Sequence, residues 1–332
     1  MPERALVLVA GSGRSGTSLF AGVLQRLGFR VPQPEVPADE TNPRGFGESQ
    51  WVVDFHTELL KRAQVQVADA RPAAWAHAAQ IGLEPAHRQR LQAWLRQQFS
   101  EADDVVVKDP RLSWFLPLWR GCGEAVGAPP RFVTMLRHPA AVIDSKQRSY
   151  GGWQSDVSRA AGWINQTLFT ERATRDAPRA FVIYDELLDD WTGTIGRLGE
   201  ALDLAVVRDV QPSAMRRVHE FVDRSLSRSR TDWGETRIPP ALRDLAEETW
   251  GLMPEAATAP ERLDAARAAY IELYDQAEAI AASSVAAARR RPAGAPVRMP
   301  APAARVVRLA PRRYRHRVPL RWRRRFVALI AR

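Results

Sequence analysis

Cysteine is almost absent from this sequence of 332 residues, in which Cys122 is the only one. A single thiol cannot close an intrachain disulfide, so the chain is not a small disulfide-stapled secreted domain. It also cannot supply the several thiolates of a multi-cysteine zinc or iron–sulfur site. The fold must therefore depend on an ordinary apolar core, which a composition of 45% apolar and 26% charged residues allows.

Long apolar runs are missing as well. The longest, residues 5–10 and 326–331, are far shorter than the roughly 20 residues that span a bilayer. Residues 5–10 run directly into a glycine loop and lack a basic leader and a cleavage site, so no signal peptide is expected. These absences predict a cytoplasmic protein.

Lysine is scarce, and the excess positive charge is confined to one end of the chain. The only lysines among 48 basic residues are Lys61, Lys108 and Lys146. Because the chain uses arginine almost everywhere, an arginine at a position where another protein has lysine is weak evidence of altered chemistry. Residues 289–332 contain 15 arginines and no acidic residue, whereas residues 1–288 carry a formal charge of −5. The net charge of +10 therefore comes from the C-terminal tail, residues 289–332.

The tail has two parts. Proline, alanine and arginine are abundant in residues 289–318, which predicts an extended linker. In residues 319–332, four apolar side chains fall on one face of a short helix among several arginines. A basic amphipathic helix suits an anionic membrane surface, which would make the protein peripheral to a membrane. A helix that is solvated or packs on its own protein is an equal alternative, and nucleic acid is disfavoured because no nucleic-acid-binding fold accompanies the charge.

Short apolar runs alternate with helical patterns through the first 288 residues. Buried strands are expected at residues 4–10, 29–31, 104–108, 131–136 and 179–184. Helices are expected at residues 15–27, 48–63, 84–100, 112–126, 139–149, 156–176, 186–202 and 260–288, and a long loop at residues 32–47. This alternation predicts one α/β domain over residues 1–288, with three layers and a central, mostly parallel sheet flanked by helices.

The sequence Gly11-Ser12-Gly13-Arg14-Ser15-Gly16-Thr17-Ser18 lies between the first strand and the first helix. At such a position, unpaired backbone N–H groups and the helix dipole favour an anion. The glycines let the backbone wrap closely, the hydroxyls add hydrogen-bond donors, and Arg14 adds a fixed positive charge. The composition therefore indicates an anion-binding loop rather than a plain turn capped by a serine.

Three ligand classes compete for this loop. Gly11, Gly13 and Gly16 match the dinucleotide fingerprint, but the acidic residue expected at the end of a second strand has no clear counterpart. The loop also nearly matches the P-loop of triphosphate-binding proteins, with Thr17 in place of the lysine that holds the β- and γ-phosphates. That difference argues against a triphosphate with magnesium, although Asp109 could imitate a magnesium-binding acid and keeps a P-loop kinase open.

The third class fits better, because residues 13–18 resemble the 5′-phosphosulfate loop of sulfotransferases that use 3′-phosphoadenylyl sulfate (PAPS). In that family, the basic residue at the position of Arg14 contacts the leaving phosphate and the transferred sulfuryl group. The resemblance implies a P-loop-like fold and a site in which residues 11–18 hold PAPS, whose product is 3′,5′-adenosine diphosphate. It also implies that the reaction needs no metal.

Further segments extend the resemblance over roughly residues 4–230. Residues 135–145 resemble the family's 3′-phosphate motif, an arginine followed eight residues later by a serine, here Arg137 and Ser145. A guanidinium offers the bidentate geometry that suits a phosphate dianion, although an isolated Arg-His-Pro could be a capped helix start. Residues 181–187 resemble, less closely, the strand whose tyrosine contacts adenine, which implicates Tyr184. The family's late phosphate-binding segment is not present in its usual form, and Arg228 or Arg230 is the candidate substitute.

An acceptor hydroxyl also needs a base. Members of this family use a histidine, or a glutamate soon after the phosphosulfate loop. Residues 42–48, Asn-Pro-Arg-Gly-Phe-Gly-Glu, resemble an Asn-Pro-x-Gly-x-x-Glu segment of bacterial members. Glu48 is therefore one candidate base, and His56, two helical turns on, is the other. Glu48 could instead only favour a helix dipole, and His56 could be an ordinary residue of a helix face.

Other candidates surround the expected sulfonate site. Lys108 and Arg111 follow a central strand at the end where α/β sheets bind ligands, although Asp109 could simply pair with Arg111. Arg14 and the loop amides would stabilise the charge that develops in an in-line displacement. The acceptor is expected to be a small hydroxylated metabolite, a carbohydrate or a glycolipid. The predicted substrate contacts are Phe46, Trp51, Arg111 and Trp114, although most tryptophans are expected in the core.

A non-enzymatic function also agrees with these features. The chain could bind an anion or a nucleotide without transferring a group, and the basic tail could bring it to acidic surfaces. Binding of 3′,5′-adenosine diphosphate without sulfuryl transfer would favour this alternative.

Overall fold

The computed structural model describes residues 4–40, 42–208, 210–223 and 231–289. The chain divides into two units, Met1–Gln276 and Ala277–Arg332. The described part of the second unit is the end of the helix α13 (Pro260–Arg289). The expected linker at residues 289–318 and helix at residues 319–332 lie outside the described residues, apart from Arg289, so the predicted domain division stays a prediction.

The first unit is built on a sheet of four parallel strands in the order β2-β1-β3-β4. Their bounds are β1 (Ala5–Ala10), β2 (Asp104–Lys108), β3 (Pro130–Leu136) and β4 (Arg179–Ile183). The predicted α/β fold with a parallel sheet is confirmed, as are these four strands. The side chains of β1 alternate between two clusters, with Leu6, Leu8 and Ala10 in one and Ala5, Val7 and Val9 in the other. Both faces of the central strand are therefore buried, as an uninterrupted apolar run predicts.

The prediction of a strand at residues 29–31 is wrong. The segment forms a single bridge, in which Arg30 donates to Asp104 at 2.8 Å and accepts from Val106 at 3.0 Å. The pairing cannot continue because the next residue that would donate, Pro32, has no N–H. The long loop that follows begins here.

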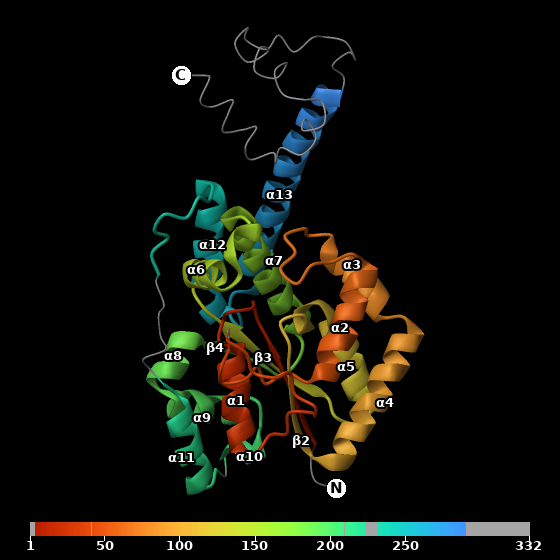
Figure 1. Ribbon diagram of the computed structural model, residues 1–332, viewed down its shortest axis with the longest axis vertical. Helices are drawn as coiled ribbons and strands as arrows, with labels where there is room; N and C mark the ends of the chain where they lie inside the picture. The colour runs from red at the N-terminus through yellow and green to blue at the C-terminus, as the bar shows by residue number, and fades with distance from the viewer. Residues whose placement is uncertain (1–3, 41, 209, 224–230, 290–332) are drawn as a thin grey trace, which may run out of the picture. The chain divides into compact units, whose positions relative to one another are not determined.

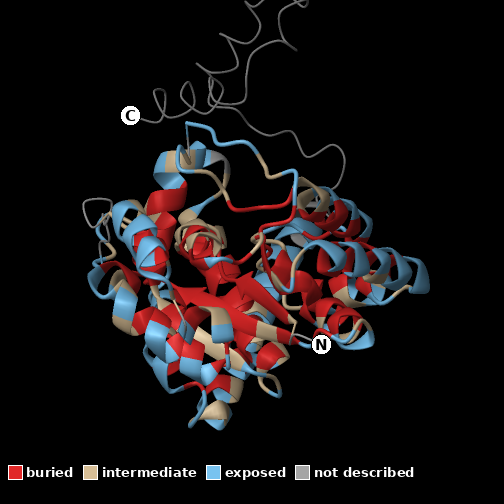
Figure 2. Cartoon of the chain, turned by 90° about the horizontal axis from the view of Figure 1, so that it is seen from below, coloured by how far each residue is buried: buried red, intermediate tan, exposed pale blue. Residues whose placement is uncertain are grey.

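Helices cover both faces of the sheet (Figure 1). One face carries α1 (Thr17–Leu27), α9 (Trp191–Ala201) and α11 (Pro212–Phe221), with the short α10 (Ala205–Arg208). The other carries α2 (Gln50–Ala63), α3 (Ala74–Gly82), α4 (Pro85–Glu101), the 3₁₀ turn η1 (Leu112–Phe115) and α5 (Leu116–Ala125). Figure 2 shows that the strands are buried while the outer faces of these helices are exposed.

A third group of helices packs around Leu136 at the carboxyl end of β3 and beside Ile183 of β4. It consists of α6 (Pro139–Tyr150), α7 (Asp156–Thr174), α12 (Pro240–Leu252) and the first part of α13, with the short turns η2 (Gly151–Trp153) and η4 (Met253–Glu255). The predicted helix at residues 186–202 is two helices, α8 (Tyr184–Asp189) and α9, because the Asp190 side chain accepts from the N–H of Gly193 at 2.9 Å and starts α9 anew. The sequence patterns did not predict α3, α10, α11 or α12.

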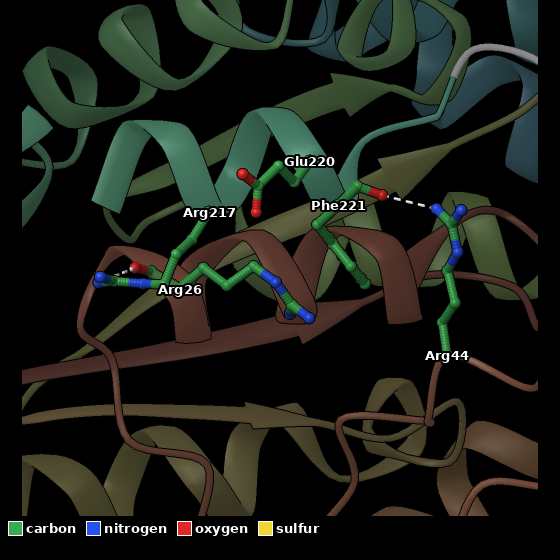
Figure 3. Close-up of a pocket in the computed structure, with 5 residues that line it drawn as sticks. All are labelled: Arg26, Arg44, Arg217, Glu220 and Phe221. Atoms are coloured by element: carbon green, nitrogen blue, oxygen red, sulfur yellow. Dashed lines mark hydrogen bonds between the residues drawn. The ribbon is translucent and has the colours of Figure 1, made fainter. Parts of the chain in front are cut away.

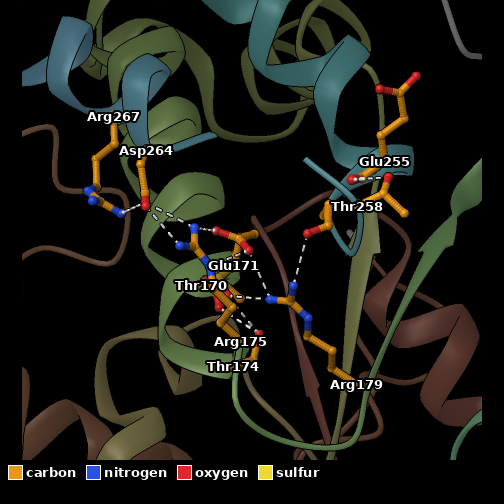
Figure 4. A network of polar contacts seen from close by, with 10 residues as sticks. Thr170, Glu171, Thr174, Arg175, Arg179, Glu255, Thr258, Asp264 and Arg267 are labelled. Carbon is orange, nitrogen blue, oxygen red and sulfur yellow. Dashed lines mark hydrogen bonds and ion pairs between the residues drawn. The ribbon is translucent and has the colours of Figure 1, made fainter. Parts of the chain in front are cut away.

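A buried carboxylate fastens the edge strand β4 to this third group. Glu171 of α7 accepts from Arg175 at 2.7 Å and from Arg179 of β4 at 3.0 Å (Figure 4). Arg175 in turn contacts Asp264 of α13 at 2.9 Å. Because Glu171 is fully buried, its charge is compensated by both guanidiniums, and loss of either would leave it poorly paired.

Candidate functional site

The loop between β1 and α1 requires glycine at two positions. Gly11 has φ of 140°, and a Cβ there would lie 2.7 Å from the carbonyl oxygen of Met135 in β3. Gly16 has φ of 89°, and a Cβ would lie 2.2 Å from Cδ2 of Tyr184. Gly13 differs, since nothing lies within 4 Å of the place where its Cβ would be. The backbone is thus packed tightly at both ends of the loop and leaves open space at its middle.

Arg14 connects this loop to α6. Its backbone has φ of 74°, a left-handed conformation that is uncommon for a residue with a side chain and that concentrates at functional sites. Its Nε donates to Oγ of Ser145 at 3.1 Å, and its carbonyl oxygen accepts from Nη1 of Arg137 at 3.1 Å. The glycine loop and the Arg137–Ser145 motif, which are more than 120 residues apart in the sequence, therefore lie in contact.

Arg137 and Tyr184 complete this side of the site. The Arg137 guanidinium lies 4.5 Å from the centre of the Tyr184 ring, and both side chains are buried. Burial lowers the pKa of Arg137, and burial raises the pKa of Tyr184. A cation held away from water in this way is stabilised by an anion that enters beside it. Tyr184, expected at the end of a strand, is the first residue of α8.

The loop contains an unused hydrogen-bonding group that a ligand could satisfy. The hydroxyl of Ser15 is 1% exposed, and its Oγ finds no partner within the described chain. An orphaned buried hydroxyl costs stability unless a bound group pairs with it. Together with the open space at Gly13 and the N-terminus of α1, it suits an oxyanion with several acceptor atoms.

A second cluster joins the loop to β2. Lys108 donates from Nζ to Oγ of Ser18 at 3.0 Å and forms a short ion pair with Oε1 of Glu48. Glu48 and Lys108 are 7% and 3% exposed, so the pair is shielded from water. Burial raises the pKa of Glu48 above its usual range, although the charge of Lys108 acts in the opposite direction. Glu48 also lies before Ser49, the cap of α2, and so is not a first-turn residue that only complements the helix dipole.

The second candidate base, His56, lies in a different environment. It is fully buried, its Nε2 accepts from the indole of Trp119 at 2.8 Å, and its Nδ1 lies 2.8 Å from Oδ2 of Asp109. Since the indole only donates, the proton of the imidazole is on Nδ1. Both nitrogens of His56 have partners inside the core, which does not favour it as a base, and this role stays a prediction.

Asp109 is the centre of this core network. Its Oδ1 accepts from Nη1 of Arg111 at 2.8 Å, and its side chain is fully buried. Burial alone would raise the pKa of Asp109, but the hydrogen bond from His56 and the charge of Arg111 hold it below its usual range. The alternative that Asp109 pairs with Arg111 is confirmed. With His56 and Arg111 on its two oxygens, Asp109 is not free to act as a magnesium-binding acid.

The predicted substrate contacts differ in exposure. Trp114 is 1% exposed, lies 4.5 Å from Trp75 and donates to the carbonyl of Val67 at 3.1 Å. Trp114 is thus a core residue, which does not favour its predicted role as a substrate contact. Trp51 is half-buried and stacked on Trp94, with ring centres 4.5 Å apart. Phe46 and Arg111 are also partly exposed, and their roles toward a substrate stay predictions.

Lys146 is the residue of this site that sequence reasoning missed. It follows Ser145 on α6, is 6% exposed, and donates to Oγ of Ser12 at 3.0 Å. The scarcity of lysine and the adjacent motif were the two available signals, because one of only three lysines lies directly after Ser145. The predicted late phosphate contacts Arg228 and Arg230 lie outside the described residues.

A separate hollow of about 420 Å³ lies near the other end of α1 (Figure 3). Its lining is Arg26, Arg44, Arg217, Glu220 and Phe221. Arg26 lies 3.6 Å from the centre of the Phe221 ring, and burial lowers its pKa, with further lowering by Arg44 and Arg217. Arg44 pairs with Asp223 at 3.0 Å. This hollow is lined from the C-terminal half of α1, whereas the glycine loop precedes its N-terminus, so the two sites are distinct.

No protein-family profile matches the sequence, and no curated protein is significantly similar to it. Among solved structures, the chain is similar to a domain of the Synechococcus PCC 7002 olefin synthase, with 18% identity and a TM-score of 0.46, over 76% of this chain and 95% of that one. It is also similar to a domain of the curacin biosynthetic pathway, with 16% identity and a TM-score of 0.38, over 64% and 77% of the two chains. Both are sulfotransferase domains.

Two searches of the described residues were negative. They contain no group of three or more histidine, cysteine, aspartate or glutamate side chains placed to hold a metal ion. They also contain no helix that is long and apolar enough to cross a membrane.

Proposed function

We propose that this protein is a sulfotransferase that moves a sulfuryl group from PAPS to a hydroxyl of an acceptor. One observation carries the proposal: Arg14 of the glycine loop contacts both Arg137 and Ser145. PAPS bears negative groups at the 5′ and 3′ positions of one adenosine, and two adjacent cationic sites suit such a ligand. A loop and a motif that faced apart could not hold the two ends of one nucleotide.

The residues present fit this donor. The N–H groups before α1, the hydroxyl of Ser15 and the guanidinium of Arg14 would hold the phosphosulfate. Arg137 and Ser145 would hold the 3′-phosphate, and Tyr184, whose ring contacts Arg137, would contact the adenine. When bound, PAPS supplies an activated sulfuryl group. Arg14 and the loop amides would stabilise the negative charge that increases on the leaving oxygen.

Glu48 is the base in this proposal. Its Oε1 is held by Lys108, which is itself held by Ser18 at 3.0 Å. We assign the second oxygen, Oε2, to the proton of the acceptor hydroxyl. A carboxylate whose pKa is raised by burial is a stronger base than an exposed one and suits this task. Lys108 would keep the carboxylate in place and stabilise its charge before the proton arrives.

The kinase alternative has less support. The loop has Thr17 where a triphosphate-binding loop has lysine, and the two oxygens of Asp109 are engaged by His56 and Arg111. A nucleotide-binding protein without catalytic activity would need no buried Glu48–Lys108 pair beside the loop.

Thermal-shift titration separates these functions. We expect 3′,5′-adenosine diphosphate to stabilise the protein by about 2.7 kcal/mol at a hundred times its dissociation constant. NAD and ATP with magnesium serve as the competing ligands. Stabilisation by ATP with magnesium alone would refute the sulfotransferase, and binding without transfer from PAPS to any hydroxyl acceptor would favour the non-catalytic function.

We further propose that the arginine-rich residues 289–332 bind anionic membrane surfaces and that the acceptor is a glycolipid or another hydroxylated molecule presented there. The support is the sequence alone: residues 289–332 contain 15 arginines, and residues 319–332 carry an apolar stripe. Co-sedimentation with vesicles that contain an anionic lipid tests it. The full chain should sediment and residues 1–288 should not, while equal sedimentation would leave a soluble metabolite or carbohydrate as the acceptor.

A further inference from the structure

The ammonium group of Lys146 is buried without a countercharge. Its side chain is 6% exposed, and its hydrogen bond is to a neutral hydroxyl, Oγ of Ser12, at 3.0 Å. Within the described chain, no carboxylate lies at ion-pair distance from its Nζ. A buried cation is costly unless an anion compensates it. The arrangement therefore points to an anion that binds from outside.

The charged groups around Lys146 do not supply that anion. Arg159 of α7 adds a second positive charge and contacts Asp156 at 3.4 Å. On α6 itself, Asp144 is paired with Arg148 at 2.6 Å. On α12, Glu247 faces His138 at 3.3 Å. Within the described residues, Asp156, Asp144 and Glu247 thus each face another side chain, and none forms an ion pair with Lys146.

Burial and, to a smaller extent, Arg159 lower the pKa of Lys146 to about 8. In the free protein, about half of the Lys146 side chains are therefore protonated at pH 8, and most are protonated at pH 7. A negative ligand beside Nζ would reverse the shift, because an opposite charge favours the protonated form. Lys146 then becomes more strongly protonated as the ligand binds.

A second, independent observation points to the same place. Ser12, the partner of Lys146, belongs to the loop in which Oγ of Ser15 is buried and lacks a hydrogen-bond partner among the described residues. Ser145, which directly precedes Lys146 in α6, contacts Arg14 of this loop. Among the described residues, a cation without a countercharge therefore lies beside this loop, and a hydroxyl without a hydrogen-bond partner lies within it.

We infer that Lys146 is a further ligand of the phosphate- or sulfate-class anion that the glycine loop binds, with Ser12 holding its ammonium group in position. The inference rests on the proposed function in so far as the anion is a phosphate or sulfonate group of PAPS. It extends that function by assigning a third cation, besides Arg14 and Arg137, to the donor. It also makes binding dependent on pH through a group outside both motifs.

The small number of lysines allows a direct test. In protein labelled with ¹³C at the lysine ε-carbons, only Lys61, Lys108 and Lys146 give signals, and Lys146→Arg assigns the third. We expect this signal to titrate near pH 8 in the free protein and at higher pH after addition of 3′,5′-adenosine diphosphate or inorganic pyrophosphate. The signal of exposed Lys61 should not respond.

The outcomes separate this inference from the proposed function. If the nucleotide binds and the Lys146 signal does not move, Lys146 is not a ligand, while the sulfotransferase stands. If only pyrophosphate binds and moves the signal, the loop is an anion site with Lys146 as a ligand, and the PAPS assignment fails. If neither binds, both are overturned.

Substitution gives a second readout that a merely structural lysine would not produce. Lys146→Met removes the charge and keeps the stem, so it should raise the melting temperature of the free protein at pH 7 and weaken binding of 3′,5′-adenosine diphosphate at least tenfold. Above pH 8, the affinity of the unsubstituted protein should fall more steeply with pH than that of Lys146→Met, by up to about tenfold per pH unit. Lys61→Arg is the matched control. A lower melting temperature with unchanged affinity would mean that Lys146 only supports the fold.

Discussion

The Glu48–Lys108 pair gives the sharpest prediction, because stability and catalysis should respond differently to its removal. Replacing either residue alone leaves the other as a poorly paired group in a site that is less than a tenth exposed. Breaking a buried ion pair in this way costs about 3–5 kcal/mol. We expect Glu48→Gln to lose about this much free energy of unfolding. Glu48→Gln/Lys108→Met, which removes both charges, should recover most of it.

Turnover should follow a different order. If Glu48 accepts the proton, Glu48→Gln should lower turnover by about two to four orders of magnitude, and the double variant should be equally slow despite its stability. Turnover of the unsubstituted protein should rise with pH through the raised pKa of Glu48, since the ionised form is the base. Lys108→Met removes a charge that lowers this pKa, so its pH profile should move to higher pH and its activity should recover there.

The assay is release of 3′,5′-adenosine diphosphate from PAPS in the presence of a panel of hydroxyl acceptors, with urea unfolding measured on the same samples. Glu58→Gln is the matched control, because Glu58 lies on α2 and forms an exposed ion pair with Arg90 at 2.6 Å. Such a pair contributes less than about 1 kcal/mol, and turnover should not change. Near-normal turnover of the double variant would show that Glu48 is not the base.

Three further predictions concern stability. Gly16→Ala places a Cβ 2.2 Å from the Tyr184 ring at φ of 89°, so it should lower the free energy of unfolding in urea by about 2–4 kcal/mol. Gly13→Ala, whose Cβ would have nothing within 4 Å, should lower it by under about 1 kcal/mol. Equal losses for the two variants would contradict the packing described. His56→Phe should cost about 3 kcal/mol because Asp109 and Trp119 lose their hydrogen bonds to His56. The folded variant should keep the proposed turnover within about threefold, and a loss of hundreds-fold would support His56 as the base. The pKa of Lys146, about 8 when folded against 10.5 for an unperturbed lysine, means that unfolding takes up a proton between these values. Relative to Lys146→Met, the unsubstituted protein should therefore gain up to about 3 kcal/mol as pH rises from 8 to 10.5, and a constant difference would exclude the shift.

Local sequence signals were sufficient to predict the four strands of the sheet. The strands β1 and β2 are apolar runs that end at Gly11 and just before Pro110, and both signals are local. The glycine loop was also readable, because three glycines among hydroxyl residues have few other uses at the start of a helix. The expected strand at residues 29–31 failed for an equally local reason, the missing N–H of Pro32.

The arrangement of the site was harder to predict because it depends on contacts between distant segments. Glu48 and Lys108 are 60 residues apart, and His56 and Asp109 are 53 apart, so their pairing depends on how the tertiary fold brings these two segments together. A histidine on a helix face looks the same in the sequence whether it reaches a cleft or the core. Lys146 had no role assigned for a related reason: its contact with Ser12 depends on the rotation of α6 against the loop.

The double attachment of Arg14 has a consequence for cooperativity. Its side chain contacts Ser145 and its backbone carbonyl contacts Arg137, the two residues that we propose for the 3′-phosphate, while we propose its own charge for the 5′-phosphosulfate. Two fragments, such as sulfate and adenosine 3′-monophosphate, would then share a common structural element. By thermodynamic reciprocity, each fragment must alter the affinity of the other by the same factor, and that factor measures how firmly one residue joins the two halves.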